Sequence, residues 1–262
     1  MAFITIKRTR IILFSCCVLI CIMLGCLSNF KKTDKDFSFE NEKELIATLD
    51  SLFVELNKIE TKNHDYKAIE SIVSINEKIR RVIENIQSKE ILKALEIEYG
   101  KSRHAFTFVI SPDRNVGIFS WFTRMDASGN AIKNIALHLS KDKIIPTSLY
   151  GEPIMYRKIY QVDSNTGQTM YLVYGNIDNP SSSFQRLNSY ILRDGHLEVY
   201  YSFPNRESHI STRLAKENNL PNHFEVLENG LKIEFRDTLD TSSVHQSLFF
   251  NGDKFVNNTF ED

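Results

Sequence analysis

The chain has 262 residues, of which 42% are hydrophobic and 25% charged, and its formal net charge is −1. These values are close to those of ordinary globular proteins, so they exclude a disordered chain, a collagen-like fibre and a polytopic membrane protein. The absence of a basic excess argues against nucleic acid as a partner. The abundance of Phe and Tyr, 18 and 10 residues, favours a chain rich in β-strands.

The first 25 residues have the anatomy of a secretion signal. Three basic residues come first: Lys7, Arg8 and Arg10. They precede an apolar run over 11–24, which is short for a membrane-spanning helix. The run ends at Gly25-Cys26, which resembles a bacterial lipobox, so we expect a signal peptide over 1–25 and a lipid anchor on Cys26 that holds the mature chain on the outer membrane. The alternative is an uncleaved signal anchor.

The remaining three cysteines, at positions 16, 17 and 21, precede Cys26, and no cysteine follows it. A disulfide or a Cys-ligated zinc site in the body of the chain is therefore excluded. The polar stretch 26–40 is typical of a flexible tether. Two lysines precede its first aspartate, which leaves open whether the protein faces the periplasm or the cell surface.

A helical segment is predicted over 41–100. Apolar residues recur at three- and four-residue spacing over 41–60 and again over 65–87, where Asp65 is a candidate cap. Ser88 is suited to cap a short third helix that ends near Glu96. The short connection between the first two helices predicts an antiparallel hairpin whose apolar stripe, which includes Tyr66, Ile69 and Val73, packs on the chain itself. The alternative is that this stripe binds a partner.

From about Ala105 the apolar period changes to two, which predicts an antiparallel β domain over 101–262. Asp194-Gly195 and Asn229-Gly230 are strong hairpin signals between such runs. The predicted strands are 105–111, 116–124, 132–139, 155–162, 169–174, 188–192, 196–203, 224–227, 231–236, 246–250 and 254–256. We therefore expect an α+β fold, with an N-terminal α-hairpin packed on an antiparallel domain that is a meander, a sandwich or a small propeller-like array.

Short motifs between Phe108 and Leu197 resemble uncharacterised secreted lipoproteins of Bacteroides-like bacteria. Residues 109–113 (VISPD) and 118–121 (IFSW) are similar to an S-x-D-G-x5-S-W hairpin of that family, and 171–175 (YLVYG) and 194–197 (DGHL) are similar to a later part of it. Asn115 stands near the place where the family prefers glycine, and Ser128-Gly129 replaces a Gly-Gly pair. The resemblance implies an envelope location and a β-rich fold, and it implies no activity.

Motifs for catalysis, cofactors and metals are absent from the sequence. It has no Gly-x-Ser-x-Gly nucleophile turn, no phosphate-binding glycine loop and no His pair at metal-ligand spacing. The turn over 163–167 has only part of a calcium loop. His196 and Glu198 share one strand face and could form a base with its orienting carboxylate, but an ordinary hairpin-edge histidine is favoured. We therefore predict no catalytic residue, no metal site and no cofactor.

Aromatic residues offer the remaining candidate site. Tyr200, Tyr201 and Trp121 are the candidates for an exposed platform that binds a glycan or a peptide, because adjacent residues such as Tyr200 and Tyr201 point to opposite sides of a strand. Other tyrosines of the β domain could contribute: Tyr156, Tyr160, Tyr171, Tyr174 and Tyr190. The favoured function is a non-enzymatic envelope lipoprotein that binds a glycan, a peptide or an envelope protein. The alternatives are an envelope hydrolase with dispersed carboxylates and a structural subunit of an envelope complex.

Overall fold

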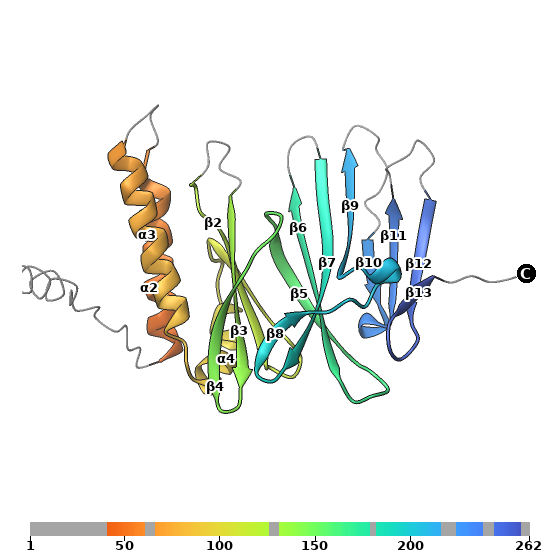
Figure 1. Cartoon of the computed structure of the whole chain (residues 1–262). Helices are drawn as coiled ribbons and strands as arrows, with labels where there is room; N and C mark the ends of the chain where they lie inside the picture. Colours follow the sequence, from red (N-terminus) through yellow and green to blue (C-terminus); the bar gives the residue numbers. More distant parts are fainter. Residues whose placement is uncertain are drawn as a thin grey trace, which may run out of the picture. The chain divides into compact units, whose positions relative to one another are not determined.

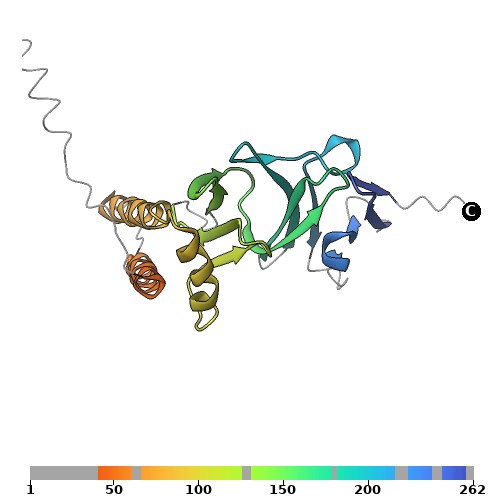
Figure 2. The same cartoon turned by 90° about the horizontal axis from the view of Figure 1, so that it is seen from below.

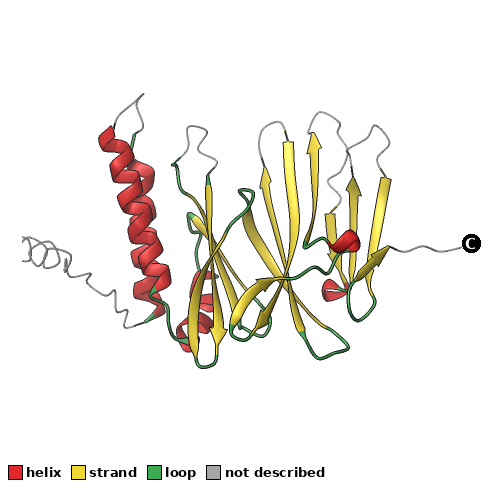
Figure 3. Ribbon diagram, in the orientation of Figure 1, coloured by secondary structure: helices red, strands yellow, loops and turns green. Residues whose placement is uncertain are grey.

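The computed structural model describes residues 41–60, 66–125, 131–178, 182–215, 224–237 and 244–257. The predicted signal peptide and tether lie outside these residues. Helices come first in the described chain and strands follow in three antiparallel sheets, so the predicted α+β class is confirmed (Figures 1 and 3). None of the described helices combines the length and the apolar character that crossing a membrane requires.

Three helices form the N-terminal part of the described chain. They are α2 (Glu42–Lys58), α3 (Tyr66–Glu84) and α4 (Lys89–Tyr99). The Asn41 side chain caps α2 by accepting a hydrogen bond from the Glu44 backbone N–H at 3.0 Å. The predicted cap of α4 is confirmed, because Ser88 Oγ accepts from the backbone N–H groups of Glu90 and Ile91. The candidate cap Asp65 lies outside the described residues.

Each of the three sheets is built on a meander in which consecutive strands pair, with one exception in the second sheet. The first contains β1 (Phe106–Ile110), β2 (Val116–Phe122), β3 (Ile132–Ser140) and β4 (Lys143–Leu149). The second contains β5 (Met155–Asp163), β6 (Thr169–Asp178), β7 (Ser182–Arg193) and β8 (His196–Val199), with β9 (His209–Ala215) also paired to β7. The third contains β10 (Phe224–Leu227), β11 (Lys232–Asp237), β12 (Val244–Phe250) and β13 (Phe255–Asn257). Two 3-10 turns are η1 (Pro204–Arg206) and η3 (Glu228–Gly230).

Two of these strands, β4 and β9, have no counterpart in the sequence analysis. Pro146 lies within β4, and a proline in a strand is tolerated where its missing N–H is not needed, as at the edge position that β4 occupies. Strand β9 forms because β7 is long enough to pair with β9 along its first half and with β8 along its last residues. The strand predicted over 196–203 is correspondingly shorter and ends at Val199.

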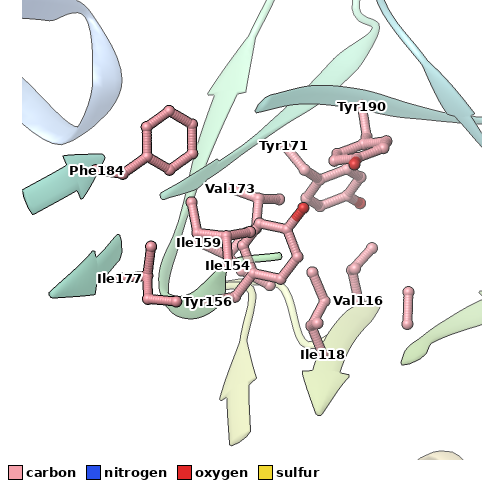
Figure 4. Packing of buried hydrophobic residues seen from close by; sticks show 11 residues of the cluster. Val116, Ile118, Ile154, Tyr156, Ile159, Tyr171, Val173, Ile177, Phe184 and Tyr190 are labelled. Carbon is pink, nitrogen blue, oxygen red and sulfur yellow. The ribbon is translucent and has the colours of Figure 1, made fainter. Parts of the chain in front are cut away.

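The second sheet lies between the other two and is covered on both faces (Figures 1 and 2). Figure 4 shows the cluster on one face, where Val116 and Ile118 of the first sheet meet Tyr156, Val173 and Tyr190 of the second. On the opposite face, a second cluster joins residues of the second and third sheets, with Phe203 between them. It contains Val162, Met170, Leu172, Leu187, Ile191, Phe203, Phe224, Ile233, Phe235, Leu248 and Phe255. Because successive side chains along a strand point to opposite faces of the sheet, the second sheet contributes residues to two hydrophobic cores.

The helices cover the other face of the first sheet. Phe53 of α2 stacks on Phe106 of β1 with ring centroids 5.2 Å apart, and its ring edge meets Trp121 of β2 at 6.5 Å. Because β2 contacts helices on one side and the second sheet on the other, all of its residues except Phe122 are buried. Most residues of the predicted apolar stripe on the helical hairpin therefore pack against the rest of the chain, as expected. Tyr66, Ile69 and Val73 are the exceptions and are exposed to solvent.

A buried polar network joins α3 to β2. The Asn76 side chain donates from Nδ2 to the carbonyl oxygens of Ile72 and Thr123, both at 2.8 Å, and its Oδ1 accepts from Trp121 Nε1 at 2.9 Å. Arg124, just after β2, donates from its guanidinium to the carbonyl of Leu56 at the end of α2. These bonds satisfy buried groups at a fixed geometry and so set the position of the helices on the sheet.

Candidate functional site

Of the three aromatic candidates, Trp121 is not part of an exposed platform. Its ring is fully buried between α2, α3 and the first sheet, so the prediction for this residue is wrong. Tyr201 is 66% exposed, whereas Tyr200 is half-buried against the cluster between the second and third sheets. One ring of the pair therefore leaves the core as expected, although both residues follow the end of β8 instead of lying in a strand.

The other tyrosines divide into two groups. Tyr156, Tyr171 and Tyr190 are buried in the cluster between the first and second sheets and form no exposed aromatic platform (Figure 4). Tyr160 of β5 and Tyr174 of β6 are half-buried and line an open hollow of about 300 Å³. The alternation of residues along a strand could not predict which tyrosines are buried and which line the hollow. Both faces of the second sheet are covered, each by a different sheet.

The hollow runs along β10, whose four residues, Phe224, Glu225, Val226 and Leu227, all line it. We call it the β10 groove. Tyr174 stacks on Phe224 with ring centroids 5.6 Å apart and an interplanar angle of 28°. Burial raises the pKa of Tyr160 above its ordinary value, so its hydroxyl stays protonated at neutral pH. Aromatic and aliphatic side chains thus supply most of the lining residues, and Glu225 adds an exposed carboxylate.

The groove also includes the end of a sheet. Among the described strands, β10 is the terminal member of the third sheet and pairs only with β11, from Phe224 opposite Phe235 to Leu227 opposite Lys232. A terminal strand presents backbone N–H and C=O groups on the side without a neighbour. The groove therefore combines aromatic side chains with a strand edge, two features that extended peptides use together.

Residues considered for catalysis do not converge in the described chain. His196 is exposed, and Glu198 accepts a 3.4 Å hydrogen bond from Arg193. Within the described ranges, no group of three or more His, Cys, Asp or Glu side chains is placed to hold a metal ion. A second open hollow, between α2 and α3, contains Glu55, Glu70 and Lys78 on solvent-facing helix surfaces.

The S-x-D and S-W residues serve structural roles. Asp113 accepts hydrogen bonds from Ser111 Oγ at 2.6 Å and from Tyr171 Oη at 2.8 Å, which joins the β1–β2 turn to the second sheet. Ser120 Oγ accepts from the Tyr156 backbone N–H at 3.2 Å. Arg114, which follows the aspartate, has a φ of 58°, a left-handed conformation that glycine adopts most easily. These residues hold layers together and form no exposed site.

Comparisons with known proteins add no further assignment, because no family model, curated protein or solved structure matches the chain. The geometry of the β10 groove is therefore the basis for assigning a function.

Proposed function

We propose that the protein is an envelope lipoprotein that binds an extended peptide segment of a partner protein, without catalysis, in the β10 groove. The observation that carries the proposal is the combination of a terminal strand with a hollow of about 300 Å³ beside it. In this mode, backbone hydrogen bonds to the strand edge supply affinity, and side chains that enter the hollow supply specificity.

A peptide is favoured over a glycan as the ligand because neighbouring side chains already cover ring faces of the two tyrosines in the groove. A sugar ring stacks on a flat aromatic face that is free. One face of Tyr174 is already covered by Phe224, and the Lys158 ammonium lies 4.5 Å from the centre of the Tyr160 ring. The apolar side chains Val226 and Leu227 along the groove favour the side chains of a peptide over the hydroxyls of a glycan.

The test is binding of the mature protein to a library of random extended peptides and, in parallel, to an array of neutral glycans. Tyr160→Ala and Tyr174→Ala should each weaken peptide binding at least about tenfold, because each removes a wall of the hollow. Tyr66→Ala is the matched control, since this tyrosine is 77% exposed on α3, and it should bind like the parent. Selected peptides should be enriched in alternating apolar residues.

Two outcomes would contradict this assignment. Peptide binding that survives both tyrosine substitutions would place the site elsewhere, with Tyr201→Ala as the next variant to examine. Glycan binding that Tyr174→Ala abolishes, with no peptide selected, would assign the groove to carbohydrate.

The membrane location rests on the sequence Gly25-Cys26 after an apolar run, and lipidation of Cys26 is part of the proposal. Cys26→Ala should release the protein from the membrane fraction or block its processing, because the acyl chains would have no attachment site. Fractionation and acyl labelling of cells that express each form measure this. Unchanged membrane association, size and labelling in the variant would exclude the anchor.

A further inference from the structure

A small polar pocket lies on the opposite face of the second sheet from the β10 groove, between that sheet and the first. Its inner space is about 20 Å³, and its lining includes Asn134 of β3, Tyr156 of β5, and Arg186 and Asn188 of β7. The connection from β4 to β5 contributes Tyr150, Gly151 and Glu152 to the lining. We call it the Asn134 pocket.

Hydrogen bonds fix the side chains on the β7 wall. Arg186 Nε donates to Asn188 Oδ1 at 2.8 Å, and Asn188 Nδ2 donates to the Tyr156 hydroxyl at 2.9 Å. Burial and the neighbouring Tyr190 raise the pKa of Tyr156 well above its ordinary value, so this hydroxyl is neutral at physiological pH. The wall is therefore preorganised, and a ligand would bind it without first ordering these groups.

Two groups of the pocket have unused hydrogen-bonding capacity. Asn134 is only 6% exposed, yet its Oδ1 accepts no hydrogen bond from the described residues. A buried acceptor without a partner is costly, and such an atom in a pocket indicates a donor that arrives from outside. Arg186 lines the same pocket, and its hydrogen bond to Asn188 uses Nε, which is one of the five N–H donors that a guanidinium carries.

The two unused groups restrict the ligand. Arg186 and Glu152 both line the pocket with opposite charges, so an anion would be repelled by Glu152 and by the Asn134 carbonyl oxygen, and an ammonium would be repelled by Arg186. A hydroxyl group is neutral and both donates and accepts, and it is small enough for the narrow inner space. Neighbouring hydroxyls can therefore serve Asn134 and Arg186 together.

We propose that the Asn134 pocket binds vicinal hydroxyl groups of a small neutral polyol, such as the edge of a monosaccharide ring. One hydroxyl donates to Asn134 Oδ1, and its neighbour accepts from the Arg186 guanidinium. Tyr150, which is 93% exposed at the mouth, offers a free aromatic face for the C–H side of the ring. This site is independent of the peptide proposed for the β10 groove.

Saturation-transfer NMR with the full-length chain in detergent tests the proposal, with D-glucose, D-galactose and D-mannose as probes and acetamide and glycine as comparators. At least one hexose should bind, and Asn134→Leu and Arg186→Lys should each weaken it about tenfold or more. Asn134→Leu should stay folded, because it replaces an unpaired buried acceptor with an apolar group of similar size. Arg193→Lys, at an exposed arginine of the same strand, is the matched control.

Tyr174→Ala separates the two sites: it should leave hexose binding unchanged even if it abolishes peptide binding. The proposal is overturned if no hexose gives saturation transfer, if hexose binding is indifferent to Asn134→Leu and Arg186→Lys in folded protein, or if acetamide or glycine displaces the hexose at lower concentration. A high-resolution crystal structure grown in hexose that holds only a water molecule at Asn134 Oδ1 would overturn it as well.

Discussion

The boundary between the helices and the first sheet differs in kind from the boundary between the second and third sheets. At the first, aromatic packing of Phe53 is combined with two hydrogen bonds of the buried Asn76 side chain across the boundary, which donates to the Thr123 carbonyl and accepts from Trp121. At the second, the contacts are mainly apolar, as where Phe203 stacks on Phe255 at 5.3 Å, and the boundary opens into the β10 groove at one edge.

We infer from this difference that the helix boundary holds the fold together and that the boundary between the second and third sheets is suited to binding another molecule. Directional bonds to buried groups tolerate little movement, so the helix boundary is suited to holding one arrangement. An apolar boundary with an open edge leaves surface and backbone groups for another molecule. The predictions that follow test this division, from the largest expected effect to the smallest.

Removal of residues 41–100 should have the largest effect. It would expose the buried aromatic side chains Phe106, Phe108, Phe119 and Trp121 on one face of the first sheet, a large apolar patch for a monomer. We expect the fragment 101–262 to aggregate or to lose its cooperative urea-unfolding transition, measured against the mature chain. A soluble fragment that unfolds cooperatively would show that the helices are dispensable and would favour the structural-subunit alternative.

Asn76→Leu should lower the free energy of unfolding by about 2–4 kcal/mol, because it leaves the Trp121 N–H and the Thr123 carbonyl buried without this partner. Urea denaturation measures the loss. Adding Trp121→Phe to the variant should recover part of it by removing the unpaired donor. A loss below about 0.5 kcal/mol would mean that the helix boundary depends on apolar packing alone, as the other boundary does.

The smallest effect concerns pH and a buried residue in the first sheet. His138 is buried on β3 with Nε2 3.0 Å from Thr147 Oγ1, and burial, with a smaller contribution from the charge of His196, lowers the pKa of His138 below its ordinary 6.5. Below pH 6.5, His138 binds a proton more readily in the unfolded chain than in the folded chain. The contribution of neutral His138 to the free energy of unfolding is therefore fully present above pH 6.5 and is lost as the pH falls to the lowered pKa.

His138→Gln should therefore flatten the pH dependence of the urea midpoint between about pH 7.5 and about pH 5, relative to the parent. His196→Gln is the control, because this histidine is exposed and should change the slope less. An unchanged slope in the His138 variant would assign the pH dependence to other groups.

Local features of the chain could be predicted from the sequence. Ser88 caps α4 as expected, since capping involves only the next turn of the helix. Asp194-Gly195 and Asn229-Gly230 form the expected turns, and all four residues have positive φ values. The helix-to-strand order and the antiparallel class follow from such local signals, because periodicity and turn chemistry act over a few residues.

The tertiary structure alone decided which faces meet and where a ligand could bind. Trp121 is a plausible platform residue by composition, but a partner 45 residues away, Asn76, and the helices above it bury it. Tyr160 lines the groove and Tyr156 does not, because a β-bulge after Tyr156 shifts the register and the two faces of the second sheet meet different neighbours. Burial depends on contacts between segments far apart in the chain, and no local pattern encodes those contacts.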